Sequence, residues 1–286
     1  MSKNVAALSK SSSFAGKNEP SKQPVLMMVT PEMAQEWLTR NTNNRRLSKG
    51  TVAAYARDIV AGDWLVTGDA IRFDNSGMLI DGQHRLQACI QAELPFNSYV
   101  IGGLDSAVMR VIDHPRIRTV ADNMHRENLR HPVLMAAASR WLFVFKYGSL
   151  AIGKGRVTPT EVMRMANRHP KLERSCAVSN GCFGVTASIL SAVHYVAANL
   201  VDGADQETAD NFAAVFTAGQ SFYPDDAALA WRERLLRMRE ARTRLVQEQM
   251  QRGTVHAWNL FRQQIPVKNM RIPDVVLFDG LDYETL

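Results

Sequence analysis

Five consecutive residues, Asp81-Gly82-Gln83-His84-Arg85, bring together side chains that could bind an anion. They follow the apolar run 78–80, and a helix-period pattern begins directly after them. This order predicts a strand, a tight turn and a helix that starts at the turn. Unpartnered N–H groups and the dipole at a helix start favour anions, above all phosphates.

Four residues of this 81–85 loop have a chemistry that suits a phosphate ligand or its metal ion. Gly82 has no Cβ, so the backbone can approach a ligand closely or adopt a positive φ. Arg85 can fork onto phosphate oxygens, and His84 can donate a hydrogen bond. Asp81 can hold a divalent metal ion or act as a base. An Asp-Gly pair alone is equally typical of an ordinary turn, and His84 and Arg85 favour the functional interpretation.

The elements that must position this loop form one compact pattern of about 90 residues. Thr30 is a good N-cap before Pro31, and Ser48 caps a second helix that Gly62 stops. The expected elements, in chain order, are a strand 25–29, helices 31–40 and 48–62, a β-hairpin 71–80, a helix from 85 to 93, a strand 96–101 and a helix 106–112. Their order predicts a mixed α/β domain.

Strand signals almost vanish after residue 131. Thr158 as N-cap, Pro159 at the first helical position and Glu161 two residues on mark one helix start clearly. The expected helices are 132–147, 158–168, 184–201, 205–218, 224–250 and 253–264. We therefore predict an α+β protein, with a disordered tail 1–23, a mixed domain 24–122 and an all-α helical domain 123–286.

The net charge of +6 is unevenly distributed. Residues 116–174 hold 12 basic and 4 acidic side chains, whereas 25–115 hold 8 and 10, and 175–286 hold 10 and 13. A local excess of +8 is typical of a surface that binds a polyanion, and solvated helix faces would give the same count. The candidate nucleic-acid contacts in this block are Arg116, Arg118, Arg126 and Arg130.

The three cysteines, Cys89, Cys176 and Cys182, are odd in number and have no metal-ligand spacing. They argue against a disulfide framework or a zinc site and favour a reducing cytoplasm. The first twenty residues contain no long apolar stretch, which argues against a signal peptide, and no later run is long enough for a membrane span. We expect Cys89, on the apolar face of its helix, to be chemically inert.

Residues 25–122 resemble the ParB/sulfiredoxin superfamily, and the motif that carries the resemblance is LIDGQHRLQA. It is similar to the DGQHR-type loop of phage and mobile-element members. It also aligns with the Gly-Glu-Arg-Arg loop of ParB and the Gly-Cys-His-Arg loop of sulfiredoxin. An early strand, a polar loop Asn43-Asn44-Arg45-Arg46, a long helix and the hairpin precede the motif in the matching order. The resemblance covers about a third of the chain.

The resemblance implies that the 81–85 loop binds nucleotide phosphates, as ParB binds CTP and sulfiredoxin binds ATP, with Mg²⁺. Carried over by position, Gly82, His84 and Arg85 would contact phosphate, and Asp81, from its own chemistry, is our candidate metal ligand. The polar loop would face the nucleotide through Asn44, Arg45 and Arg46. A solvated loop is the alternative for these three residues.

The candidate catalytic residues are Asp81, Gln83 and His84, and Gln83 departs from both relatives. It stands where sulfiredoxin has its catalytic cysteine, which argues against sulfinic-acid reduction. It also stands where ParB has a glutamate tied to hydrolysis, and a neutral amide cannot act as a base. Efficient hydrolysis by the ParB route is therefore not expected.

We expect a nucleotide-binding, ParB-like protein that associates with DNA. One alternative is an enzyme of the same fold, a phosphotransferase or nucleotide hydrolase acting on a small molecule or a modified base. The other is a non-catalytic interaction scaffold. The expected partners are a nucleotide and nucleic acid, without a membrane, and a homodimer is one option for the assembly.

Overall fold

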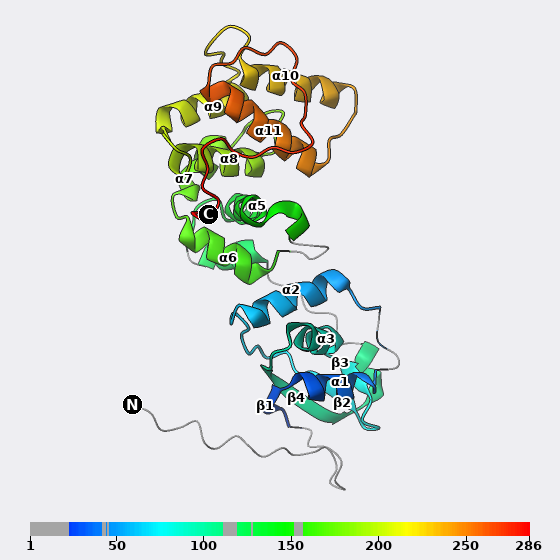
Figure 1. The fold of residues 1–286 in the computed structure, drawn as a ribbon. Coiled ribbons are helices and arrows are strands. Elements are labelled where there is room, and N and C mark those ends of the chain that lie inside the picture. The colour runs from blue at the N-terminus through cyan, green and yellow to red at the C-terminus, as the bar shows by residue number, and fades with distance from the viewer. Residues whose placement is uncertain (1–22, 42–43, 45, 111–118, 127, 152–156) are drawn as a thin grey trace, which may run out of the picture. The chain divides into compact units, whose positions relative to one another are not determined.

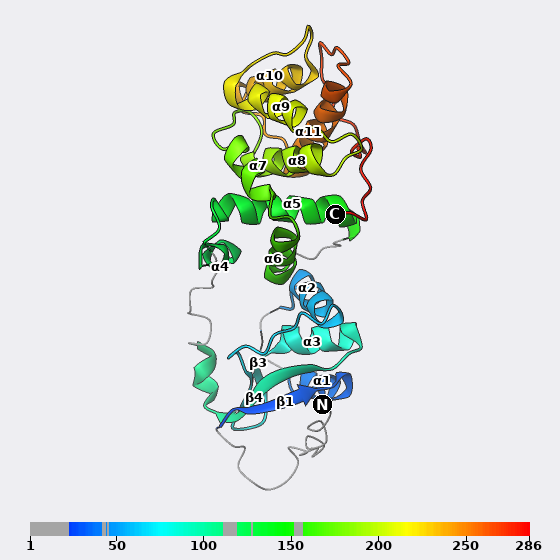
Figure 2. The same cartoon turned by 90° about the vertical axis from the view of Figure 1, so that its left-hand side faces the viewer.

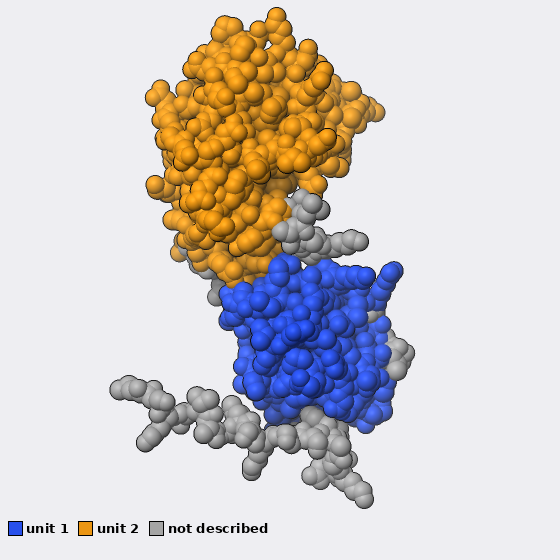
Figure 3. All heavy atoms as spheres, viewed as in Figure 1, with its two compact units in different colours: residues 1–116 blue, residues 117–286 orange. Residues whose placement is uncertain are grey.

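The computed structural model describes residues 23–41, 44, 46–110, 119–126, 128–151 and 157–286. Two compact units divide the chain, residues 1–116 and 117–286 (Figure 3). The fold is α+β, with a four-stranded sheet in the first unit. The expected domain boundary after residue 122 falls inside α4, Val120–Arg126, whose Val120 and Met124 are buried in the core of the second unit. All but the last residue of the predicted tail 1–23 lies outside the described residues.

The first unit follows the predicted order of strands and helices. Its elements are β1 Val25–Val29, α1 Pro31–Leu38, α2 Lys49–Val60, β2 Ile71–Asp74, β3 Leu79–Asp81, α3 Gln83–Ala92, β4 Phe96–Leu104 and the 3₁₀ helix η1 Ser106–Arg110. The sheet has the order β1-β4-β2-β3. β1 pairs antiparallel with β4, β2 pairs parallel with β4, and β2 pairs antiparallel with β3.

Side-chain caps start the first two helices as the sequence predicts. Thr30 accepts a hydrogen bond from the Met33 N–H at 3.3 Å, and Ser48 accepts one from the Thr51 N–H at 3.3 Å. Helix α3 lies between α2 and the sheet in both ribbon views (Figures 1 and 2). Its Leu86 and Cys89 are fully buried in the core of this unit, which therefore fixes the position of the helix start.

The predicted hairpin is confirmed and leads directly into the 81–85 loop. The Asp74 carboxylate accepts hydrogen bonds from the N–H groups of Ser76 at 2.8 Å and Met78 at 2.9 Å. Gly77 occupies the turn with φ +80°, a conformation that favours glycine. This turn reverses the chain so that β3 runs beside β2 and ends at Asp81.

The second unit is a helical assembly around a buried central helix (Figure 1). Besides α4, its helices are α5 Pro132–Ala151, α6 Pro159–Arg168, α7 Leu172–Ser179, α8 Ala187–Asn199, α9 Gln206–Ala218, α10 Ala227–Glu240 and α11 Gln247–Arg262. Ten consecutive residues of α8, from 188 to 197, are buried. The capping box of Thr158 and Glu161 is present as predicted. Within the described ranges, no helix is long and apolar enough to cross a membrane.

The predicted helix 224–250 is wrong, because the chain turns between α10 and α11. Arg242 adopts φ +54°, and the Thr243 N–H reaches back to the Met238 carbonyl at 2.8 Å, which is a Schellman-type helix end. Such ends usually carry glycine, so the sequence holds no stop signal there. The predicted helix 253–264 is accordingly the later part of α11. Helices α4 and α7 were not predicted.

Helices α10 and α11 pack closely because Gly253 has no side chain. A Cβ placed on Gly253 would lie 2.3 Å from the ring of Trp231, which is fully buried. The Trp231 indole N–H donates to Thr254 Oγ1 at 3.1 Å. One glycine therefore sets the distance between the two helices.

Candidate functional site

Gly82 has a backbone conformation and surroundings that the 81–85 loop requires. It follows β3 and acts as the N-cap of α3 with φ +108° and ψ 0°. No side chain caps α3 through a hydrogen bond. A Cβ on Gly82 would stand 3.0 Å from Cγ1 of Ile71, which is completely buried. Both the backbone conformation and the space at this position therefore require glycine.

The Asp81 carboxylate is held by its own loop and by two arginines. One oxygen accepts from the Gly82 N–H at 2.7 Å. The other lies 2.5 Å from Nη1 of Arg72 and 3.6 Å from Nη2 of Arg85. The side chain remains 33% exposed, so it can still offer a lone pair to an ion. Arg72 was not among the predicted site residues, although its place on the hairpin strand beside β3 sets this contact.

Arg85 points back into the first unit. Its guanidinium donates to the backbone carbonyl of Asp69 and, at 2.8 Å, to that of Ala70. The side chain is only 11% exposed. Burial lowers the pKa of Arg85, and the nearby Asp81 charge opposes that shift. In this arrangement Arg85 links α3 to the segment before β2 through hydrogen bonds. Its contact with phosphate stays a prediction.

Gln83 belongs to a chain of amides that ties the polar loop to the site. The side chain is 5% exposed and accepts from Asn41 Nδ2 at 3.0 Å. Asn44 Nδ2 donates to Asn41 Oδ1 and to the Leu79 carbonyl, each at 2.7 Å. The structure therefore brings the predicted residue Asn44 to the 81–85 loop, through Asn41, which was not singled out.

His84 connects the site to the start of α2. Its Nε2 accepts a hydrogen bond from the Ser48 N–H at 3.0 Å. A ring nitrogen that accepts a hydrogen bond carries no proton, so a neutral His84 has its proton on Nδ1. His84 can therefore donate only through Nδ1 in this arrangement.

The other predicted residues are placed differently. Arg46 is exposed, while Arg45, Arg116 and Arg118 lie outside the described residues, as does the side chain of Arg126. Arg130 is exposed, and its N–H donates to the Glu173 carboxylate at 2.8 Å. Among the described residues, no group of three or more His, Cys, Asp or Glu side chains is arranged to hold a metal.

A Ser-His-Asp arrangement in the second unit was missed by sequence reasoning. The His194 ring lies 2.9 Å from Ser175 Oγ and 2.8 Å from an Asp210 oxygen. Asp210 also takes two bonds from Arg174, at 2.9 and 2.7 Å. Ser175 and His194 are 1% and 0% exposed, so no substrate reaches them and the group is structural. Nothing in the spacing of these residues indicates their contact.

Hydrogen bonds and burial set the protonation of Asp210 and His194. The two hydrogen bonds from Arg174, followed by the bond from His194, lower the pKa of Asp210 to about 2. Burial lowers the pKa of His194, and this outweighs the attraction of Asp210. Neutral His194 thus donates to Asp210 and accepts from Ser175.

The cysteines do not provide a nucleophile. Burial raises the pKa of Cys89, Cys176 and Cys182 to about 11 in each case. A thiol with such a pKa carries almost no thiolate at neutral pH. This agrees with the expectation that Cys89 is inert.

The chain has no match among models of protein families, among the curated proteins or among the solved structures.

Proposed function

We propose that the 81–85 loop binds the phosphates of a nucleoside triphosphate. The observation that carries the proposal is the start of α3, which follows a strand, has no side-chain cap and turns on Gly82 at φ +108°. The first N–H groups of an α-helix lack acceptors within the helix and sit at the positive end of its dipole. A phosphate placed there would meet these N–H groups without a Cβ in its path.

The surrounding side chains suit such a ligand in distinct ways. His84 lies at the helix start that would face the phosphates, with Nε2 bonded to the Ser48 N–H. Asp81 is one-third exposed and would share Mg²⁺ with the phosphates, because no further carboxylate is needed when the ligand supplies oxygens. Arg72 and Arg85 hold Asp81 in place. The resemblance of LIDGQHRLQA to ParB and sulfiredoxin loops supports CTP or ATP as the nucleotide.

Gln83 supports binding without rapid hydrolysis. Its amide is buried against Asn41 and has no basic group to offer a water molecule. A protein that holds a nucleotide without quickly hydrolysing it can use occupancy as a signal. We propose that occupancy of the loop governs engagement of DNA, as in a ParB-like protein.

The test of this proposal is a thermal-shift screen of the four ribonucleoside triphosphates, each with and without Mg²⁺. A ligand at one hundred times its Kd stabilises the folded state by about 2.7 kcal/mol. We expect one nucleotide to raise the melting temperature in a Mg²⁺-dependent manner. No shift with any of the four at millimolar concentration would refute the proposal.

A second candidate function, nucleic-acid binding by the second unit, rests on the +8 charge of residues 116–174. Part of this charge is neutralised, since Arg174 forms a two-bond ion pair with Asp210. Arg130 and Arg140 are exposed. Binding through phosphates should weaken with salt at a slope near −0.9 per phosphate contact on duplex DNA. Fluorescence anisotropy with labelled DNA at low ionic strength tests it, and no binding there would exclude it.

A further inference from the structure

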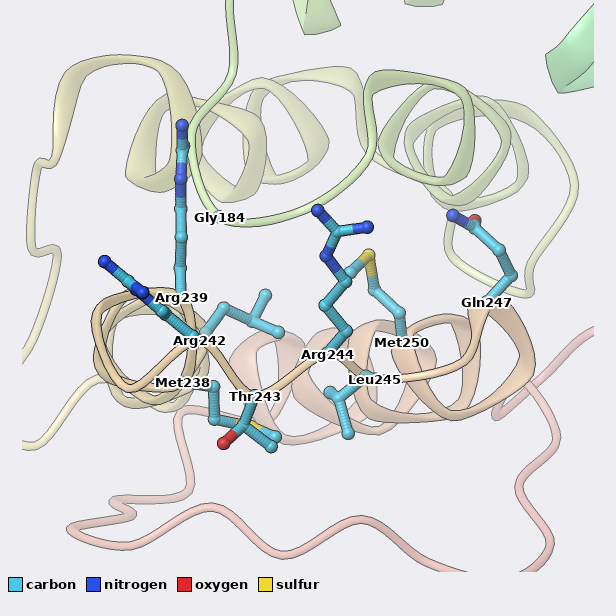
Figure 4. A pocket seen from close by; sticks show the side chains of 10 residues that line it. Gly184, Met238, Arg239, Arg242, Thr243, Arg244, Leu245, Gln247 and Met250 are labelled. Atoms are coloured by element: carbon cyan, nitrogen blue, oxygen red, sulfur yellow. The ribbon is translucent and has the colours of Figure 1, made fainter.

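A pocket of about 540 Å³ opens where α10 ends and α11 begins (Figure 4). Its walls are the last turn of α10, the turn 241–246 and the start of α11, and the segment that carries Gly184 faces them. Gly184 has φ +86°, and a Cβ there would lie 3.3 Å from the Leu235 Cβ. The glycine therefore lets this segment approach α10 closely. Every lining residue belongs to the second unit.

Three arginines of this pocket have no acidic partner. Arg239, Arg242 and Arg244 line it, and no carboxylate of the described residues lies within salt-bridge distance of their guanidinium groups. Arg237 on the same helix does have such a partner, Glu233 at 3.6 Å. The pocket therefore gathers positive charge that the described part of the chain leaves uncompensated.

Two of these arginines extend in the same direction, and Arg242 extends away from Arg244 (Figure 4). Arg239 comes from the end of α10 and Arg244 from the turn, and both extend toward the Gly184 segment (Figure 4). Helix α11 starts at Gln247 on the same pocket. The side chain of its N-cap, Val246, accepts no hydrogen bond, and the Gln249 side chain accepts one from the Val246 N–H at 3.3 Å. Guanidinium groups bind phosphate oxygens through forked hydrogen bonds, and a helix start adds the favourable end of its dipole.

Apart from Thr243 and Gln247, the remaining side chains that line the pocket are apolar. Leu235, Met238, Leu245 and Met250 contribute side chains to the pocket. Thioethers are polarizable and make favourable contacts with aromatic rings. A volume of about 540 Å³ is within the usual range of small-molecule sites. Apolar side chains beside three guanidinium groups match a molecule with a flat apolar part and an anionic part.

We propose that this pocket is a second anion site, which binds a phosphorylated small molecule that carries an aromatic ring. The phosphates lie against Arg239, Arg242 and Arg244, and the ring packs on the methionine and leucine side chains. The site is independent of the 81–85 loop, because it uses other residues in the other unit.

The test is a titration followed by NMR of ¹³C-labelled methionine methyl groups, with ADP and inorganic pyrophosphate as separate probes. Met238 and Met250 report on this pocket, and Met78, next to β3, reports on the 81–85 loop. We expect ADP to shift the Met238 and Met250 signals. Pyrophosphate, which lacks the ring, should bind at the same residues about tenfold more weakly, if the ring contributes about 1.4 kcal/mol.

Variants decide whether the arginines hold the ligand. Because each arginine would donate hydrogen bonds to a charged phosphate, Arg244→Ala should weaken the binding of ADP at least about tenfold. The variant lacking all three guanidinium groups (R239A/R242A/R244A) should lose binding. Arg237→Ala is the matched control and should leave the affinity unchanged, because Arg237 is paired with Glu233 and does not line the pocket.

Three outcomes would overturn the proposal. The first is an absence of Met238 and Met250 shifts with either probe at low ionic strength. The second is equal ADP affinity in the wild type and the triple variant. The third is a shift of these signals by duplex DNA but not by ADP, which would make the arginines a nucleic-acid surface instead.

Discussion

Replacing Gly82 with alanine should destabilise the first unit and weaken nucleotide binding together. A residue other than glycine at φ +108° carries strain of about 1–3 kcal/mol. The added Cβ would also press against Ile71 at 3.0 Å, and crowding in a packed core costs about 1–3 kcal/mol. Ile71 is completely buried, so it can yield only by displacing its packed neighbours. The total expected loss in the free energy of unfolding is therefore about 2–6 kcal/mol.

Gly77→Ala is the matched control for this substitution. Gly77 lies in the turn of the hairpin that leads into the 81–85 loop and also has a positive φ, +80°, but a Cβ there would meet no atom within 4 Å. Gly77→Ala should lower the free energy of unfolding only by the cost of the positive φ, about 1–3 kcal/mol.

Urea unfolding, followed by hydrogen exchange of peptides from residues 71–92, measures both variants in the first unit alone. If Gly82→Ala proves no more destabilising than Gly77→Ala, the close contact with Ile71 does not constrain the loop and the reasoning fails.

Three further predictions concern the rest of the molecule. Gly253→Ala should destabilise the second unit by about 3 kcal/mol or more, because the new Cβ would lie 2.3 Å from the buried Trp231 ring, despite the better helix propensity of alanine. Gly68→Ala, with open space around it, should be neutral, and thermal unfolding compares the two. Acid should destabilise the protein in two windows, measured by urea unfolding from pH 7 to pH 2. Because the pKa of His194 is lowered in the folded state, the unfolded chain takes up a proton at higher pH than the folded chain does. The free energy of unfolding therefore falls below about pH 6.5, and this fall should be smaller in His194→Gln. The lowered pKa of Asp210 stabilises the folded state above about pH 3.8, and this contribution is lost toward pH 2. It is worth about 1 kcal/mol once the 36% exposure of Asp210 is discounted. An unchanged loss of stability at acid pH in Asp210→Asn would contradict this. Gln83→Glu should raise the rate of nucleotide hydrolysis in a phosphate-release assay, and rapid hydrolysis by the wild type would show that another group supplies the base.

Local sequence signals predicted several helix starts and the hairpin well. Thr30, Ser48 and Thr158 mark helix starts through side chains that reach only three residues along the chain, so a linear pattern contains the whole interaction. The hairpin was predictable for the same reason. The turn at Arg242 was not, because a non-glycine residue takes a positive φ there and breaks the helix without a sequence signal.

The contacts that define the site were less accessible to sequence reasoning. The motif indicated a strand, a glycine turn and a helix start, and all three are present. It did not indicate that Arg85 turns inward, that His84 binds the start of α2, or that Gln83 is buried against Asn41. These contacts join residues 15 to 42 positions apart, so they depend on how the elements pack. The unpaired arginines near 239–244 became apparent only once the chain was seen to turn there.

The central claim is tested most directly by calorimetric titration of ATP and of CTP, each with Mg²⁺. The titrated protein is the R239A/R242A/R244A variant, in which the second pocket cannot contribute to binding. We predict that one of the two nucleotides binds with one-to-one stoichiometry. We also predict that adding Gly82→Ala weakens it at least about tenfold, whereas adding Gly77→Ala does not. No binding of either nucleotide up to millimolar concentration, or an affinity that Gly82→Ala leaves unchanged, would contradict the assignment of the 81–85 loop as a phosphate site.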